Sequence, residues 1–253
     1  MRLIATLIAI MTLTLGAVPA WSAPSFLVVD LDTKEVLHDS GPDAPRSIAS
    51  ITKLMTAIVV LQSDLDLDSN ILITKQDRVS ATALIPGKSY SRRELLLLAL
   101  IKSDNGAAHA LARSYPGGIN EFIKEMNHTA RTDIKMSNSR FVDSSGLNAG
   151  NKSTATDLVK MVMYGQQFRF IREASDMSSV TIGKRIYGTT NRMLKAGWNI
   201  VVAKTGLTNA AGQCFVAIWE DRGHKMAMVI LGSNNRWSDS QILRTKALGV
   251  ISQ

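Results

Sequence analysis

The chain has 253 residues, 45% of them hydrophobic, and a formal net charge of +8. This length and composition suffice for one domain with a sizeable core, and they argue against a disordered protein. The sequence shows no basic cluster with interleaved aromatic residues, so we expect no nucleic-acid partner. The positive charge suits surroundings rich in carboxylates and phosphates, although it serves solubility equally well. Cys214 is the single cysteine, which excludes an internal disulfide, and its apolar neighbours predict a buried thiol.

The first 23 residues have the pattern of an export signal. Arg2 precedes an apolar run over residues 3–18, and small residues follow as far as Ala23. We predict a secretory signal peptide over residues 1–23, cleaved near residues 20–23. An uncleaved anchor is the alternative, but the run is slightly short and lacks a basic stop-transfer flank. We therefore expect an exported protein of the periplasm or cell envelope, soluble after cleavage and without a stable membrane anchor.

Strand and helix patterns then follow one another along residues 24–253. The runs 26–30 and 35–38 around the turn at 32–34 predict a β-hairpin. From Ser50 onward, apolar residues recur at helical spacing and predict a helix that is buried nearly all round. A capping box at 91–94 opens the next helix. Further helices are expected over 105–113, from a cap at Asn120 through 125, and over 154–164.

The last third of the chain is rich in β-strand patterns. We predict strands over 180–184, 199–205, 213–220 and 225–231, with a turn at 221–223 and a closing helix over 239–250. Strands at both ends with helices between them indicate the α+β class, in one antiparallel sheet covered by helices with a mostly helical subregion. No repeat or linker divides residues 24–253, so we predict one domain.

Three short motifs carry the chemistry. They are Ser50-Ile-Thr-Lys53, Ser103-Asp-Asn105 and Lys204-Thr-Gly206. The first is common by chance, whereas each of the other two is expected on the order of 0.05 times in a chain of this length. All three in order, within suitable local structures, form a strong signal. Together they are the known signature of class A β-lactamases and penicillin-binding proteins.

The first motif places a base beside a nucleophile. A serine hydroxyl is a poor nucleophile until a neighbouring group takes its proton. Residues three apart share a helix face, so Lys53 can place its amine beside the Ser50 oxygen. We expect partial burial and neighbouring cations to lower the pKa of Lys53 enough for it to act as a base. Free N–H groups at the helix start would stabilise an oxyanion.

The second motif lies between two predicted helices. There Ser103 could relay a proton to the leaving amine, and Asn105 could hold the substrate amide. Helix capping is the alternative for these residues. The third motif is expected to end a strand.

At the end of this strand, Lys204 and Thr205 would meet a substrate carboxylate. Gly206 would allow close approach of a peptide that pairs with the strand edge. The N–H of Leu207 is a second candidate oxyanion donor.

Other catalytic patterns are weak or absent. The four histidines, His38, His109, His128 and His224, form no metal-binding pair such as H-E-x-x-H. No G-x-S-x-G elbow accompanies them, and no phosphate-binding or dinucleotide-binding glycine motif occurs. We predict no metal and no cofactor.

The chain resembles the D-alanyl-D-alanine carboxypeptidase/endopeptidase family, the low-molecular-mass penicillin-binding proteins of peptidase family S11. The resemblance covers the mature chain and is carried by residues 47–57, 85–87, 90–95, 141–147 and 153–158. Ser103-Asp-Asn105, residues 115–118, 198–200 and 204–214 are similar to the penicillin-binding protein 7 type, a D-alanyl-D-alanine endopeptidase. Many carboxypeptidase relatives add a C-terminal β-domain and an amphipathic anchor, and neither pattern follows the closing helix here.

The resemblance implies a serine β-lactamase/DD-peptidase-like fold that acts on peptidoglycan peptides, with β-lactam antibiotics as covalent inhibitors. It implies Ser50 as acyl-ester nucleophile, Lys53 as proton acceptor, Ser103 as proton relay and Lys204 as substrate-carboxylate contact. Cleavage of D-alanyl cross-links is the function we expect, and removal of a terminal D-alanine is the alternative.

Two more distant alternatives, a β-lactamase and a non-catalytic binding protein, would each be expected to have different residues at the site. A β-lactamase needs a base for fast deacylation, and no E-x-x-L-N segment supplies the glutamate of class A enzymes. A non-catalytic peptidoglycan-binding protein could share the fold. It would be expected to lack Ser50 or Lys53, and both are present.

Overall fold

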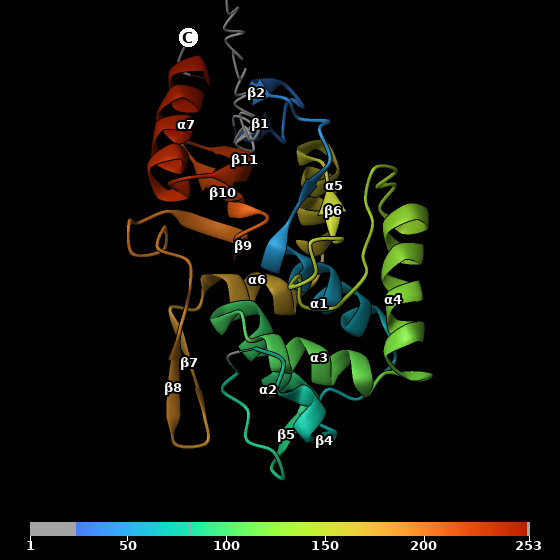
Figure 1. The fold of residues 1–253 in the computed structure, drawn as a ribbon. Helices are drawn as coiled ribbons and strands as arrows, with labels where there is room; N and C mark the ends of the chain where they lie inside the picture. The colour runs from blue at the N-terminus through green and yellow to red at the C-terminus, as the bar shows by residue number, and fades with distance from the viewer. Residues whose placement is uncertain (1–23, 81, 252–253) are drawn as a thin grey trace, which may run out of the picture.

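The computed structural model describes residues 24–80 and 82–251 (Figure 1). The predicted signal peptide over residues 1–23 lies outside the described residues. Within those described, no helix combines the length and the apolar character needed to cross a membrane.

A five-stranded sheet brings together the two ends of the described chain. Its strand order is β2-β1-β11-β10-β9, and every neighbouring pair is antiparallel. The predicted hairpin near the start and the turn at 221–223 are both confirmed, as is the α+β class. β9 forms one edge of the sheet, which leaves one of its sides unpaired. The strands are β1 (Ser25–Asp30), β2 (Val36–Ser40), β9 (Asn199–Thr208), β10 (Gly212–Asp221) and β11 (His224–Ser233).

Each face of this sheet is covered by helices. Successive side chains of a strand point to opposite faces, so β10 contributes to two separate cores. Phe215 and Trp219 pack with Leu243 of α7 (Arg236–Ile251) in one core. Val216 and Ile218 pack in the larger core with the remaining helices. The predicted closing helix is therefore confirmed, and it begins earlier than expected.

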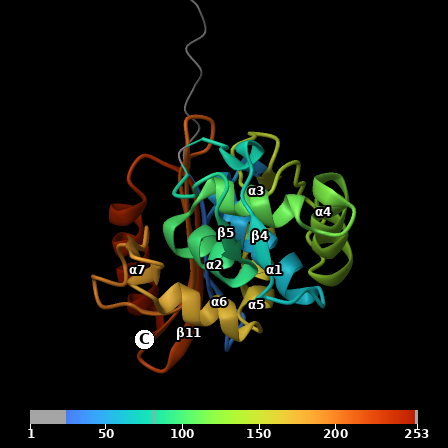
Figure 2. The same ribbon diagram turned by 90° about the horizontal axis from the view of Figure 1, so that it is seen from below.

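The larger core lies under a mostly helical region, which Figure 2 shows from below with α4 and α7 on opposite sides. The first helix begins as a 3-10 turn that holds Ser50. The capping box at Ser91 and Glu94 is present, and Thr154 caps α5, where the sequence predicts the start of a helix. The elements are η1 (Ala49–Ile51), α1 (Thr52–Gln62), η2 (Lys75–Asp77), α2 (Arg92–Leu97), η3 (Leu98–Lys102), α3 (Asn105–Arg113), α4 (Gly118–His128), η4 (Thr129–Asp133), α5 (Ala155–Gly165) and α6 (Arg169–Asp176).

Three two-stranded sheets lie outside the main one. β3 (Arg46–Ser47) pairs with β6 (Lys152–Ser153), and β4 (Asn70–Leu72) pairs with β5 (Ser89–Ser91). β7 (Ser179–Ile182) and β8 (Arg185–Gly188) form a hairpin that projects from the body in Figure 1. Of this hairpin, the sequence patterns predicted only the first strand.

Two sequence expectations about elements were wrong, and one helix was missed. α4 begins at Gly118 after the cap Gly117, so Asn120 lies inside the helix; both glycines have positive φ and turn the chain earlier than expected. α6 was missed because its charged residues obscure a short apolar face. β9 runs to Thr208, since its pairing with β10 continues through Gly206, Leu207 and Thr208. The third motif therefore lies within the strand and not at its end.

Candidate active site

The three motifs meet where the first helix, the η3–α3 junction and β9 come together. Ser50 lies in η1 and Lys53 in the first turn of α1, which fixes their three-residue spacing on one helical face. The second motif lies at the junction of η3 and α3, and Lys204 comes from β9. Hydrogen bonds join Lys53 to the first two motifs and Lys204 to the second. The structure thus brings together residues that are distant in the chain.

Lys53 is the buried centre of this arrangement. Its Nζ lies 2.8 Å from Ser50 Oγ, 2.8 Å from Asn105 Oδ1 and 2.6 Å from the carbonyl oxygen of Ser145. Burial lowers the pKa of Lys53 to about 7, although the carboxylates of Asp143 and Asp104 raise it. The lowered pKa expected from the sequence has burial as its cause rather than a neighbouring cation.

Lys204 occupies the opposite side of the site. Its Nζ lies 2.9 Å from Ser103 Oγ and 3.0 Å from the carbonyl oxygen of Thr205. Burial, together with the charges of Lys53 and Arg236, holds the pKa of Lys204 well below its ordinary value. Two lysines with lowered pKa values therefore lie on either side of the second motif.

Helix capping is the alternative role for the second motif, and its middle residue, Asp104, performs it. The Asp104 carboxylate accepts hydrogen bonds from the N–H of Ala107, at 2.9 Å, and from Thr82 and Ala83. Ser103 has a left-handed backbone (φ 61°) between η3 and α3. This conformation and the buried Asp104 leave the Ser103 hydroxyl directed at Lys204. Residues other than glycine rarely adopt a left-handed backbone, and those that do cluster at functional sites.

A further loop, for which the sequence indicates no role in the site, closes the site from another side. Gly146 has φ +84°, and a Cβ there would lie 1.9 Å from the carbonyl oxygen of Ala49. The Asp143 carboxylate holds the loop by accepting backbone N–H groups from Ser145, Gly146 and Asn148. In the sequence, the only indication of this contact is the glycine that follows two serines. The fold shows that Gly146 lies against the backbone that precedes Ser50.

Gly206 of β9 lies against the segment that holds the nucleophile. A Cβ on Gly206 would lie 2.9 Å from the carbonyl oxygen of Ile48 and 3.2 Å from Ser50 N, so only glycine allows this approach. The Gly206 carbonyl accepts a hydrogen bond from Arg236 Nη1 at 2.6 Å. The next residue, Leu207, is 62% exposed. Its role as an oxyanion donor stays a prediction.

Thr205 and a cationic cavity adjoin each other. Thr205 Oγ1 lies 2.6 Å from Thr190 Oγ1. Thr190 in turn lines a cavity of about 670 Å³, together with the basic side chains of Arg192, Lys195 and Arg236. No acidic residue lines this cavity, so it favours an anionic group. These cations come from separate segments whose meeting depends on the fold, so no local sequence pattern indicates them.

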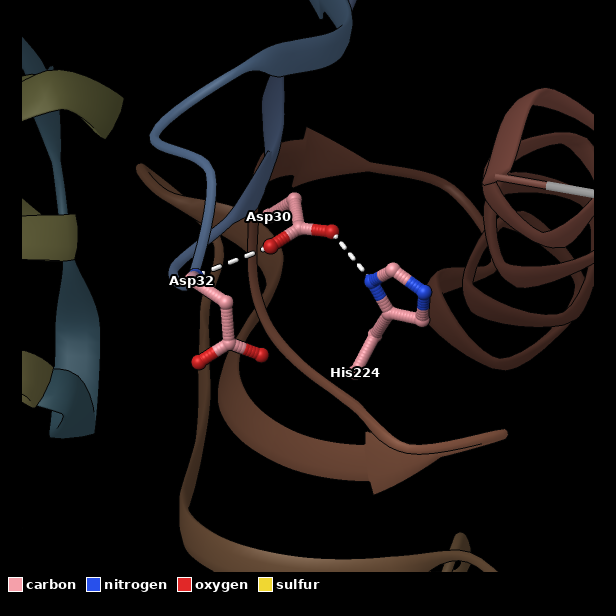
Figure 3. Close-up of side chains that lie close together, drawn as sticks. All are labelled: Asp30, Asp32 and His224. Carbon is pink, nitrogen blue, oxygen red and sulfur yellow. Dashed lines mark hydrogen bonds and ion pairs between the residues drawn. The ribbon is translucent and has the colours of Figure 1, made fainter.

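One group among the described residues has the composition of a metal site, away from the three motifs. Asp30, Asp32 and His224 place ligand atoms within 4.8 Å of one another (Figure 3). Both Asp30 oxygens already accept hydrogen bonds, one from the N–H groups of Asp32 and Thr33 and the other from His224 Nδ1 at 2.7 Å. These bonds outweigh burial and hold the pKa of Asp30 below its ordinary value. The contacts are those of a turn and an ion pair that links β1 to β11.

The serine, the two buried lysines and the sheet covered by helices define the class of serine DD-peptidases. Residues 13–235 match the family model described as D-alanyl-D-alanine carboxypeptidase, peptidase S11. The chain belongs to this family, and it is a serine-type DD-peptidase acting on peptidoglycan and binding β-lactams.

Individual relatives agree with the family model. The chain is 38% identical to a D-alanyl-D-alanine endopeptidase of Escherichia coli, over 92% of this chain and 79% of the relative. It is also 38% identical to one of Pseudomonas aeruginosa, over 87% and 75%. Its fold is similar to the crystal structure of the Streptomyces K15 DD-transpeptidase, with a TM-score of 0.82, 28% identity, and coverage of 88% of this chain and 96% of that one.

Proposed function

We propose that this protein is a D-alanyl-D-alanine endopeptidase that hydrolyses D-alanyl cross-links in peptidoglycan through an acyl-enzyme on Ser50. The observation that carries the mechanism is the buried Lys53 amine, 2.8 Å from the Ser50 hydroxyl. The preference for cross-links rests on relatives at 38% identity that are named endopeptidases. A Streptomyces relative at 30% identity is named a carboxypeptidase, which keeps removal of a terminal D-alanine as the second candidate.

Acylation begins with proton transfer. Neutral Lys53 takes the proton of Ser50, whose oxygen attacks the D-alanyl carbonyl carbon, and the carbonyl becomes a tetrahedral oxyanion. The N–H groups of Ser50 and Leu207 donate to that oxyanion. Asn105, bound to Lys53 at 2.8 Å, holds the lysine and the substrate amide in place.

Departure of the amine requires a proton on its nitrogen. Ser103 donates its hydroxyl proton to the leaving nitrogen and recovers one from Lys204, whose Nζ lies 2.9 Å from its oxygen. The proton that Lys53 took from Ser50 then replaces the one lost by Lys204, so Lys53 is neutral again when water arrives. The C–N bond breaks and leaves the D-alanyl ester on Ser50. Water, deprotonated by Lys53, then attacks the ester carbonyl carbon. The C–O bond to Ser50 breaks, the peptide leaves with a free carboxyl group, and Lys53 returns the proton to the Ser50 oxygen.

Substrate binding uses the β9 edge and its cations. The peptide pairs with the free edge of β9, and Gly206 allows it to approach. Thr205 donates its hydroxyl to the carboxylate of the leaving residue, and Lys204 with Arg236 supplies positive charge. The cavity beside Thr190 extends this positive environment.

The remaining parts of the proposal concern domain organisation, export, cofactors and partners, and sequence patterns support them. Residues 1–23 are a signal peptide, and residues 24–253 form one catalytic domain that is exported and soluble after cleavage. The reaction needs no metal or cofactor, because Lys53 supplies the base and backbone N–H groups supply the oxyanion site. Nucleic acid is not a partner.

Intact mass after incubation with benzylpenicillin tests the acyl-enzyme. We expect an adduct of one drug mass on the mature protein and none on Ser50→Ala. No adduct with intact drug would contradict catalysis and favour a binding protein, whereas no adduct with consumed drug would favour a β-lactamase.

Purified cross-linked muropeptides test the bond that is cut. We expect the enzyme to convert dimers to monomers. An enzyme that trims pentapeptides and leaves dimers intact is a carboxypeptidase, and that result would refute the endopeptidase proposal.

A further inference from the structure

A second cavity lies between the β7–β8 hairpin and the segment leading into α2. Its volume is about 410 Å³. Its lining combines three basic residues, two tyrosines and one carboxylate, and none of these belongs to the three motifs. They are Lys88, Lys184, Arg185, Tyr90, Tyr187 and Glu94.

The three basic side chains of this cavity have no partner among the residues that the structure describes. Neither Lys88 nor Lys184 nor Arg185 forms a side-chain hydrogen bond or ion pair there. Elsewhere in the same region arginines are paired, as Arg93 is with Asp68 at 2.8 Å. Unpaired cations that converge on one hollow attract an anionic ligand.

The carboxylate and the tyrosines complete the description of the cavity. Glu94 Oε2 is already engaged, since it accepts the N–H of Ser91 at 2.8 Å in the capping box. Burial raises the pKa of Tyr90. The two rings and the Arg185 guanidinium line the same cavity. Tyrosine supplies an apolar surface with a polar end, which suits a peptide that carries both aliphatic and charged parts.

The position of the cavity relates it to the leaving group. Thr190 contacts Thr205, which in the proposed function receives the carboxylate of the leaving residue. Tyr187 precedes Thr190 by three residues, so the two lie within about 10 Å of each other. A single leaving D-alanine ends at Thr205. A leaving strand from a cross-link continues beyond it and is long enough to reach Tyr187.

We propose that the cavity formed by Lys88, Lys184, Arg185, Tyr90 and Tyr187 binds a carboxylate of the leaving peptide strand beyond the scissile bond. This inference rests on the proposed endopeptidase function and names the surface that distinguishes a cross-link from a terminal D-alanine. Several weak charge contacts at an exposed site change affinity on the order of tenfold. The cavity therefore adds selectivity for an acidic leaving strand without taking part in the chemistry.

Paired substrates test this site. One is a cross-linked peptide dimer whose leaving strand has a free carboxylate beyond the scissile bond, and the other is the same dimer with that carboxylate amidated. We expect wild-type kcat/KM to favour the acidic dimer on the order of tenfold. In Lys184→Gln/Arg185→Gln this preference should fall to about one.

Lys34→Gln/Lys246→Gln is the matched control, because it removes the same charge at two exposed positions. It should keep the wild-type preference, and Lys88→Gln alone should reduce it. Acylation of every variant by benzylpenicillin confirms folding and the Ser50 chemistry independently.

Three outcomes would overturn the site: no preference in the wild type, a preference that survives in the double variant, or an equal loss in the control. An enzyme that is acylated but cleaves neither dimer contradicts the endopeptidase function, and the leaving-strand site with it.

Discussion

Lys204 Nζ lies 2.9 Å from Ser103 Oγ, which joins the edge strand β9 to the junction of η3 and α3. Lys53 lies on the other side of the same junction, 2.8 Å from Asn105 Oδ1. Ser50 can therefore exchange a proton with Lys53, and Ser103 with Lys204, through groups that are already within hydrogen-bond distance. Burial lowers the pKa of Lys53 to about 7, so its amine can change protonation state near neutral pH.

Removal of the Ser103 hydroxyl tests this relay. Ser103→Ala should lower the second-order rate of acylation by benzylpenicillin about 10²- to 10⁴-fold, because the leaving nitrogen loses its proton donor. The thermal midpoint should change little, since the Asp104 carboxylate caps α3 and Ser103 does not. Acylation within twofold of the wild-type rate would remove Ser103 from the mechanism.

The acylation rate should depend on pH through Lys53. Only neutral Lys53 accepts the proton of Ser50, and its pKa is about 7. The rate should therefore rise with pH, about tenfold per unit below pH 6, and become constant above about pH 8. Lys53→Arg stays protonated throughout and should be inactive at every pH. A rate independent of pH between about 5 and 8 would contradict the assignment of Lys53 as the base.

Gly146 tests the loop that closes the site. Gly146→Ala places a Cβ 1.9 Å from the carbonyl oxygen of Ala49, so the backbone before Ser50 must move. We expect at least tenfold slower acylation by benzylpenicillin and a loss of about 2 to 4 kcal/mol in the free energy of unfolding, measured with urea.

Gly223→Ala is the matched control for Gly146→Ala. Gly223 has the same φ, +84°, and nothing lies within 4 Å of its added Cβ. It should lose only about 1 to 2 kcal/mol through the backbone conformation, with normal acylation. Equal effects of the two variants on acylation would mean that the contact with Ala49 does not position Ser50.

The sequence predicts what local patterns determine. The spacing of Ser50 and Lys53 on a helix, the Thr154 cap and the antiparallel hairpins are all local, and the structure contains them. The meeting of Lys53 with the carbonyl of Ser145 depends on packing between segments far apart in the chain, so no local pattern predicts it. The strand β9 continues past Lys204 because pairing with β10 overrides the turn that Gly206 suggests.

Two aspartate–arginine pairs, one buried and one exposed, predict losses of different size for the same substitution. Asp77 is fully buried and accepts hydrogen bonds from Arg113 Nε and Nη2, both at 2.9 Å, and contacts His109. Asp77→Ala leaves the Arg113 charge without its partner, and the free energy of unfolding should fall by about 3 to 5 kcal/mol. The Asp68 carboxylate accepts a hydrogen bond from Arg93 Nε at 2.8 Å, and 72% of the Asp68 side chain is exposed. Asp68→Ala should cost less than about 1 kcal/mol. Urea unfolding at neutral pH measures both, and similar losses would show that burial does not set the contribution of the Asp77 pair.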